Sequence, residues 1–417
     1  MRLSRRQLIG AAVIMPFDAR AESPPPTPMP TPAAGSSYLQ LLAPPSAANT
    51  TNLVGNTRLK VGGAQVFSTN YAITDAAAEI PAAPFAFKAR APGMANVEVF
   101  THDKVIFQGA PAADGSVTAT LDFSKEPLGP LVLQVDAWND GSSGQNPEIH
   151  YEIRLTLFIT SGAKTALPGA PAGVILTSAT PIFDEEWTEG INPAVWTFTK
   201  WGQGENQNFG DAVFEAPGGP HNTMTTNRGF LRIRAIYDSA VAEWFSGLLS
   251  TGFEDGHVSK GFLTGYFEAE MLLPAGAGAW PAFWMLDQAS LRPSDDSIEI
   301  DIMEAYGGFP SSYHVTVHNY TPNGDAPQSL PSSSGYTTPA DTTFDFHRFG
   351  VNITTSQITF YYDDENILSC PLKSFPSGTP LTPFYLLVNL AMGGGWPKAV
   401  PQAGYYDLWV KRITVRQ

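Results

Sequence analysis

Three carboxylic acids lie close together in a short and mostly apolar stretch of the chain. Glu299, Asp301 and Glu304 fall within residues 297–305, and the residues between them are isoleucine and methionine. Such side chains favour a buried or half-buried β-strand. Burying a charge without a partner is costly, so three acids in an apolar strand indicate a functional site.

The spacing of the three acids predicts an irregular strand. Residues two apart on a strand share a face, so Glu299 and Asp301 point together, whereas Glu304 would point the other way. A β-bulge at Ile302 and Met303 would return Glu304 to their face. Three acids on one face can supply a nucleophile, a general acid/base, and a middle carboxylate that separates the pKa values of the other two. The alternative is an edge strand whose acids are solvated.

Two tryptophans precede the acid strand in the segment Trp280-Pro281-Ala282-Phe283-Trp284. Aromatic rings can stack on the C–H faces of pyranose rings, although tryptophan is also a common core residue. Two carboxylic acids, a third acid between them and flanking tryptophans together favour glycoside hydrolysis.

Composition indicates which elements position these residues. The 417 residues are 43% hydrophobic and rich in glycine and proline (38 and 36), with many short alternating runs and no credible long helix, which predicts an all-β chain. The net charge of −15 argues against binding to nucleic acid or to an anionic membrane, and we expect a monomer. A single cysteine, Cys370, excludes an intramolecular disulfide.

The N-terminal residues resemble an export signal. Arg5 and Arg6 precede a short apolar run, and Ala19-Arg20-Ala21 has the small-x-small pattern of a cleavage site. We therefore expect residues 1–21 to be a twin-arginine-type signal and the protein to be periplasmic or secreted. Residues 22–37 form a proline-rich linker.

Two β-domains are expected after this linker. Residues 38–160 contain six or seven short strand patterns separated by turn clusters, which favours a small Ig-like β-sandwich. Residues 161–178 read as a second linker. Residues 179–417 carry many strand patterns, which predicts a β-jelly-roll (concanavalin-like) sandwich with a curved face that can bind a polymer.

Several motifs of the second domain resemble glycoside hydrolase family 16, in its laminarinase-like (endo-β-1,3-glucanase) branch. The segment 299–304 is similar to the branch's Glu-x-Asp-x-x-Glu pattern, and 280–286 to its Trp-Pro-Ala-x-Trp segment. Residues 344–351 with 358–361, and residues 383–397, are also similar, in the same order along the chain. The resemblance covers about 180–417 and leaves out the first domain.

The resemblance implies roles for individual residues. Glu299 would be the nucleophile and Glu304 the acid/base of a retaining hydrolase, with Asp301 between them. The family needs no cofactor, although some members bind structural calcium through an Asp in the last strand, where Asp407 stands. Further substrate-binding candidates are Trp280 (an exposed platform), Trp284 (a floor residue), His318, Asn206, Asn389 and Trp396.

The expected activity is cleavage of β-1,3 or mixed β-1,3/1,4 glucan by double displacement, with the polysaccharide as the partner. The same fold can also act on a galactan of the agar or carrageenan type, or transfer the sugar to another sugar. A glucan-binding, lectin-like protein is the non-enzymatic alternative. The presence of both Glu299 and Glu304 favours an enzyme.

Overall fold

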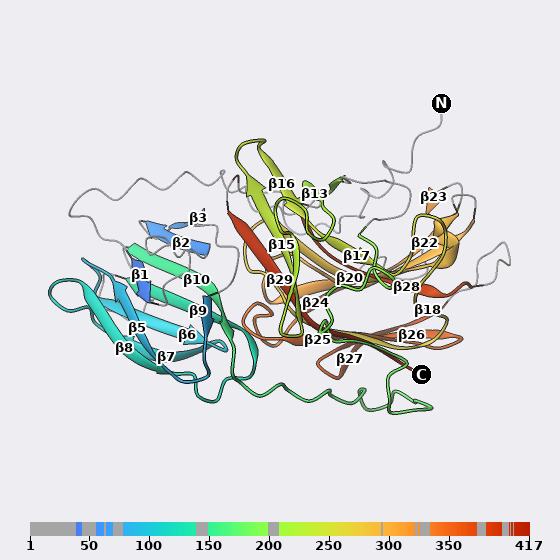
Figure 1. Ribbon diagram of the computed structural model, residues 1–417, viewed down its shortest axis with the longest axis horizontal. Helices are drawn as coiled ribbons and strands as arrows, with labels where there is room; N and C mark the ends of the chain where they lie inside the picture. The colour runs from blue at the N-terminus through green and yellow to red at the C-terminus, as the bar shows by residue number, and fades with distance from the viewer. Residues whose placement is uncertain are drawn as a thin grey trace. The chain divides into compact units, whose positions relative to one another are not determined.

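The computed structural model consists almost entirely of β-strands, as the sequence predicts (Figure 1). The described residues fall into two compact units: an N-terminal unit up to Leu167, to which Pro401–Tyr405 is also assigned, and a C-terminal unit of Pro168–Val400 and Tyr406–Gln417. Among them no helix is long and apolar enough to cross a membrane. The residues that the structure describes are 39–43, 56–61, 64–69, 78–138, 149–198, 208–292, 295–321, 324–325, 334–372, 381–393, 400, 402 and 404–417.

The N-terminal unit contains two mainly antiparallel sheets around one core. Phe87 and Leu121 of the smaller sheet join Val97, Val135 and Leu157 of the larger one in a single buried cluster. The Ig-like topology expected for this unit stays a prediction. The smaller sheet has the order β1 (Gln40–Ala43), β5 (Pro84–Arg90), β8 (Ser116–Asp122), and the larger has β3 (Ala64–Thr69), β2 (Asn56–Val61), β10 (Ile149–Ile159), β9 (Gly129–Trp138), β6 (Asn96–Thr101), β7 (Lys104–Gly109), with β4 (Ala78–Ile80) beside β10.

The C-terminal unit is a two-sheet sandwich of the jelly-roll class, as expected. Its larger sheet has the order β12 (Asn208–Phe209), β13 (Ala212–Phe214), β16 (Glu243–Ser246), β15 (Phe230–Asp238), β29 (Tyr405–Arg416), β19 (Gly265–Leu272), β25 (His347–Ile353), β26 (Gln357–Tyr362), β27 (Glu365–Pro371), with β11 (Phe183–Glu185) beside β29 and β14 (Met224–Asn227) beside β15. Its smaller sheet has the order β17 (Leu248–Ser250), β28 (Phe384–Met392), β20 (Ala279–Asp287), β21 (Ser297–Ala305), β22 (Ser312–Thr321), β23 (Gly324–Asp325), with β18 (Gly261–Phe262) beside β28 and β24 (Ser334–Thr337) beside β22.

The smaller sheet has one face toward the core. The ring of Tyr313 in β22 meets that of Phe349 in β25 edge-on, with 5.2 Å between centroids, so the two sheets pack together there. Side chains alternate along a strand, so His314, Thr316 and His318 lie on the opposite face of β22. That outer face is the one on which a site can be open to a ligand.

Candidate active site

The acid strand, β21, lies inside the smaller sheet with a neighbour on each side. It pairs antiparallel with β20 and with β22, so it is not an edge strand. Ile298 and Ile300 are 1% and 0% exposed and account for the buried face of the strand. Glu299 and Asp301 alternate with them and therefore lie on the outer face, together with His318.

The predicted β-bulge is present at the predicted residues. Along β20, Phe283 pairs with Met303 while Trp284 pairs with Asp301, which leaves Ile302 without a partner in that ladder. Along β22, the pairing moves from Asp301–Thr316 to Glu304–His314, so two residues of β21 oppose one of β22. The extra residue restores the alternation, and Glu304 returns to the face of the other two acids.

His318 completes the carboxylate cluster. It lies opposite Glu299 in the ladder, and its Nε2 is 3.4 Å from Oδ2 of Asp301. Burial alone would lower the pKa of His318, but the hydrogen bond and charge of Asp301, with the charges of both glutamates, raise that pKa to about 9. The imidazole is therefore protonated at neutral pH.

The surroundings of Glu304 favour its protonated form. Burial raises the pKa of its carboxyl well above the usual range, and the charges of Asp301 and then Glu299 raise it further. The charge of His318 and the approach of the Trp280 indole act the other way, with smaller effect. A carboxylic acid that keeps its proton beside two other acids is suited to donate that proton.

Three side chains of the site also have the spacing of possible cation ligands. One side-chain atom each of Glu299, Asp301 and His318 lie within 4.8 Å of one another, a spacing that could hold a cation. An imidazole binds a metal only when the ligating nitrogen carries no proton. Nε2 of His318 lies 3.4 Å from Oδ2 of Asp301, and a proton on this nitrogen would have to leave before it could bind a cation.

Tryptophan and asparagine side chains lie beside the acids, on the neighbouring strands β20 and β28. Trp284 is 3% exposed, and its indole N–H donates to Oδ1 of Asn389 at 2.8 Å, consistent with the predicted floor position. The side chain of Asn389 is 0% exposed, and its Oδ1 accepts the Trp284 N–H while its Nδ2 has no hydrogen-bond partner among the described residues, so substrate binding by Asn389 stays a prediction. Trp280 is only partly buried. Two other candidates, Asn206 and Trp396, lie outside the described residues.

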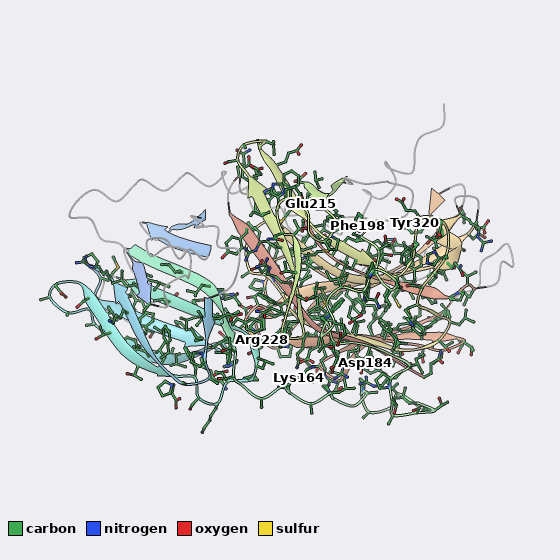
Figure 2. The ribbon with its side chains drawn as sticks, in the orientation of Figure 1. Lys164, Asp184, Phe198, Glu215, Arg228 and Tyr320 are labelled. Carbon is green, nitrogen blue, oxygen red and sulfur yellow. The ribbon has the colours of Figure 1, made fainter. Side chains whose placement is uncertain are left out.

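Sequence reasoning missed three aromatic residues beside the acids. Tyr306 stacks on Trp280, with 6.1 Å between ring centroids, and His314 lies opposite Glu304 in the ladder. Tyr320, labelled in Figure 2, stacks on His318 at 5.6 Å. The signal was available, because Tyr306 follows Glu304 by two residues and His314 precedes His318 by four.

Asp407 does not fit a calcium site. Its two carboxylate oxygens each accept a hydrogen bond from Arg234, at 2.7 Å. Calcium needs several oxygen ligands with free lone pairs, and a cation here would have to displace a guanidinium that is 2% exposed. The suggestion of structural calcium at Asp407 is therefore not supported by the residues present.

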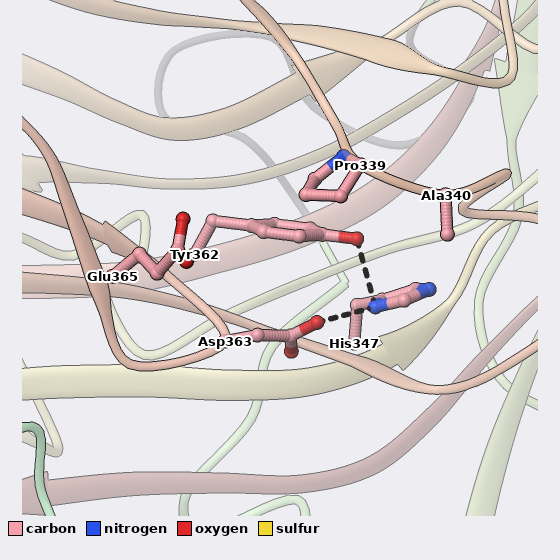
Figure 3. Close-up of a pocket in the computed structure, with 6 residues that line it drawn as sticks. All are labelled: Pro339, Ala340, His347, Tyr362, Asp363 and Glu365. Carbon is pink, nitrogen blue, oxygen red and sulfur yellow. Dashed lines mark hydrogen bonds and ion pairs between the residues drawn. The ribbon is translucent and has the colours of Figure 1, made fainter.

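A second polar cluster lies in the larger sheet (Figure 3). Nδ1 of His347 is 2.6 Å from Oδ2 of Asp363 and 2.8 Å from the hydroxyl of Tyr362, beside a cavity of about 120 Å³. Asp363 has a φ of 45° in the turn between β26 and β27, a conformation that non-glycine residues rarely adopt. The contact with His347 holds this turn, and we assign the cluster a structural role.

A jelly-roll sheet that carries clustered carboxylic acids beside tryptophan has the construction of a glycoside hydrolase. Residues 235–407 match the family Glycosyl hydrolases family 16. The matched residues all lie between β15 and β29 and include the three acids of β21.

Two curated relatives illustrate the match. The chain is 34% identical over 152 residues to an endo-1,3-1,4-beta-glycanase of Rhizobium meliloti (strain 1021), across 36% of this chain and 29% of that protein. It is 30% identical over 224 residues to glucan endo-1,3-beta-glucosidase A1 of Niallia circulans, across 49% of this chain and 30% of that protein. Among solved structures, the laminarinase from Rhodothermus marinus aligns with 57% of this chain and 96% of its own, at 26% identity and a TM-score of 0.45. The chain spans about three tenths of the length of these two curated relatives.

Proposed function

We propose that this chain is a retaining endo-glycoside hydrolase that cleaves β-1,3 or mixed β-1,3/1,4 glucan by double displacement. The observation that carries the proposal is the bulged strand, which brings Glu299, Asp301 and Glu304 to one face and leaves Glu304 with a strongly raised pKa. A retaining glycosidase needs one carboxylate that attacks and one carboxylic acid that protonates the leaving oxygen.

In the first step, the carboxylate of Glu299 attacks the anomeric carbon while Glu304 gives its proton to the glycosidic oxygen. The bond to the departing sugar breaks, and a covalent ester forms between the remaining sugar and Glu299. The imidazolium of His318, opposite Glu299, stabilises the charged form of the nucleophile before attack.

In the second step, Glu304 acts as a base. Esterification removes the charge of Glu299, which is one of the charges that raise the pKa of Glu304. That pKa therefore falls once the intermediate forms, and the carboxylate left by the first step can take a proton from water. The activated water attacks the anomeric carbon and releases Glu299, with net retention of configuration. Two carboxyl groups and water suffice, so the proposed reaction requires no cofactor.

The names of the relatives support a glucan as the substrate. Both relatives described above are named for cleavage of β-1,3 or β-1,3/1,4 linkages. Another relative, 36% identical over 117 residues, is named kappa-carrageenase, so galactans are also tested as substrates.

The proposal is tested by reducing-sugar release from laminarin, lichenan, agarose, carrageenan and xyloglucan. We expect cleavage of the first two, lowered more than about a thousandfold in Glu299→Gln and roughly 10²–10⁴-fold in Glu304→Gln. Glu270→Gln, in the larger sheet, is the matched control and should change activity little. Full activity in Glu299→Gln would refute the assignment of the nucleophile.

We also propose export through the twin-arginine route, since Arg5 and Arg6 precede an apolar run. Residues 1–21 lie outside the described residues, so the support comes from the sequence. Replacing both arginines by lysine should leave the enzyme in the cytoplasm of a host that exports the natural sequence. Unchanged export of that variant would contradict the proposal.

A further inference from the structure

Tyr306 lies beside the proposed proton donor. It is the first residue after β21 and shares the outer face with Glu304, two residues earlier. Burial raises the pKa of the Tyr306 phenol, and the charges of Glu304 and Asp301 raise it further. The ring therefore stays uncharged and close to the carboxyl that protonates the leaving group.

Tyr306 is part of an aromatic surface rather than an isolated ring. It stacks on Trp280 with an interplanar angle of 17°, and the His314 ring meets it edge-on, with 5.9 Å between centroids. Burial lowers the pKa of His314, so this imidazole is neutral at neutral pH. All three side chains are only partly buried. The surface next to Glu304 is thus aromatic, uncharged and open to a ligand.

The backbone around Tyr306 is held from both sides. Gly307 donates its N–H to the carbonyl of Ala279 at 2.9 Å and accepts the N–H of Gly276 at 2.8 Å. A Cβ atom at Gly307 would come within 2.5 Å of the Gly276 oxygen, so only glycine allows this close approach. The Tyr306 carbonyl accepts the N–H of Phe309 at 2.7 Å. Such support holds the ring in place before a ligand binds.

We propose that Tyr306, with Trp280 and His314, forms the stacking surface for the departing sugar of the glucan. The inference rests on the proposed function, in which Glu304 protonates the glycosidic oxygen. The sugar bonded through that oxygen leaves on the side of Glu304, where these rings lie, while the retained sugar faces Glu299. Pyranose C–H faces pack on aromatic rings, so Tyr306 is a specificity-determining residue for the leaving-group side.

Two substrates separate this role from a structural one. Laminaritetraose needs the departing sugar to bind, whereas β-laminaribiosyl fluoride releases fluoride and places no sugar on the Tyr306 side. We expect Tyr306→Ala to lower kcat/KM for laminaritetraose about tenfold. We expect kcat/KM for the fluoride to change by less than about twofold. Tyr306→Phe keeps the ring and should recover most of the loss on laminaritetraose.

Tyr361→Ala is the matched control, because it removes the same ring from the larger sheet, where Tyr361 packs on Tyr266. It should leave kcat/KM for both substrates unchanged. Equal losses on both substrates in Tyr306→Ala, or no loss on laminaritetraose, would overturn the inference and leave the proposed function intact. The inference and the proposed function would both be overturned if the natural chain cleaved neither substrate and if its activity on every polysaccharide equalled that of Glu299→Gln.

Discussion

The three carboxyl groups of the acid strand have the same chemistry in solution but different environments here. Asp301 is 4% exposed and pairs with His318, while Glu304 has neighbouring negative charges and an approaching indole N–H. The charge of Asp301 raises the pKa of Glu304 more than the charge of Glu299 does. The charge of Asp301 also raises that pKa more than the charge of His318 lowers it.

This electrostatic arrangement predicts how the pH profile responds to Asp301→Asn. Glu304 must be protonated to act as an acid, so activity is lost as pH rises through its raised pKa. Removing the charge of Asp301 lowers that pKa, and the alkaline limb of kcat/KM should move to lower pH. The measurement is a pH–rate profile for laminarin with the natural chain and Asp301→Asn. An unchanged or higher alkaline limb would contradict the prediction.

At the scale of elements, the bulge in β21 decides whether the acids share a face. Ile302 and Met303 together oppose one residue of β22, so the strand contains one residue more than its neighbours require. Deleting Met303 leaves only Ile302 between Asp301 and Glu304. The three acids then share a face by ordinary alternation, and Glu304 stays opposite His314. Inserting one residue instead turns Glu304 to the buried face.

We therefore expect the Met303 deletion to fold and to keep measurable cleavage of laminarin. Its free energy of unfolding should fall by about 1–3 kcal/mol, because a fully buried side chain is lost. An alanine inserted after Ile302 should fold poorly or lose activity altogether, since a charged glutamate would enter the core. Urea unfolding and reducing-sugar assays on both variants test this. A fully active insertion variant would contradict it.

The buried ion pair between Arg234 and Asp407 ties β15 to β29 in the larger sheet. Asp407→Ala leaves a guanidinium buried without its partner, which should cost about 3–5 kcal/mol of unfolding free energy. Because both oxygens of Asp407 are already engaged, EDTA or added calcium should leave the melting temperature of the natural chain unchanged. A calcium-dependent rise in melting temperature that is lost in Asp407→Ala would contradict this account.

The elements also show what the sequence can and cannot predict. Alternation within 297–305 was enough to predict the strand, its bulge and the shared face of Glu299, Asp301 and Glu304, because these are local properties of the chain. The sequence could not predict the hydrogen bond that Asn389 accepts from Trp284, because the two residues are 105 positions apart. The pairing of Arg234 with Asp407 could not be predicted either, because the two residues are 173 positions apart in the sequence.

At the scale of the whole molecule, every described residue of the candidate site belongs to the C-terminal unit. The N-terminal unit has a separate buried core. We expect a chain of residues 168–417 to fold and to cleave laminaritetraose with kcat/KM within about threefold of the longer chain. Loss of folding or of activity on this soluble substrate would show that the N-terminal unit contributes to catalysis. The same pair of chains, assayed for binding to insoluble glucan, tests whether that unit binds carbohydrate.

In the proposed reaction Glu299 forms a covalent bond with the sugar, and trapping that intermediate is the most direct test. A 2-deoxy-2-fluoro laminaribioside with a good leaving group should inactivate the natural chain, because the fluorine slows release from the ester. Digestion and mass spectrometry should then find the added disaccharide on Glu299, with no label in Glu299→Gln. Label on Glu304 or elsewhere, or an active chain that yields products of inverted configuration without any label, would contradict the account.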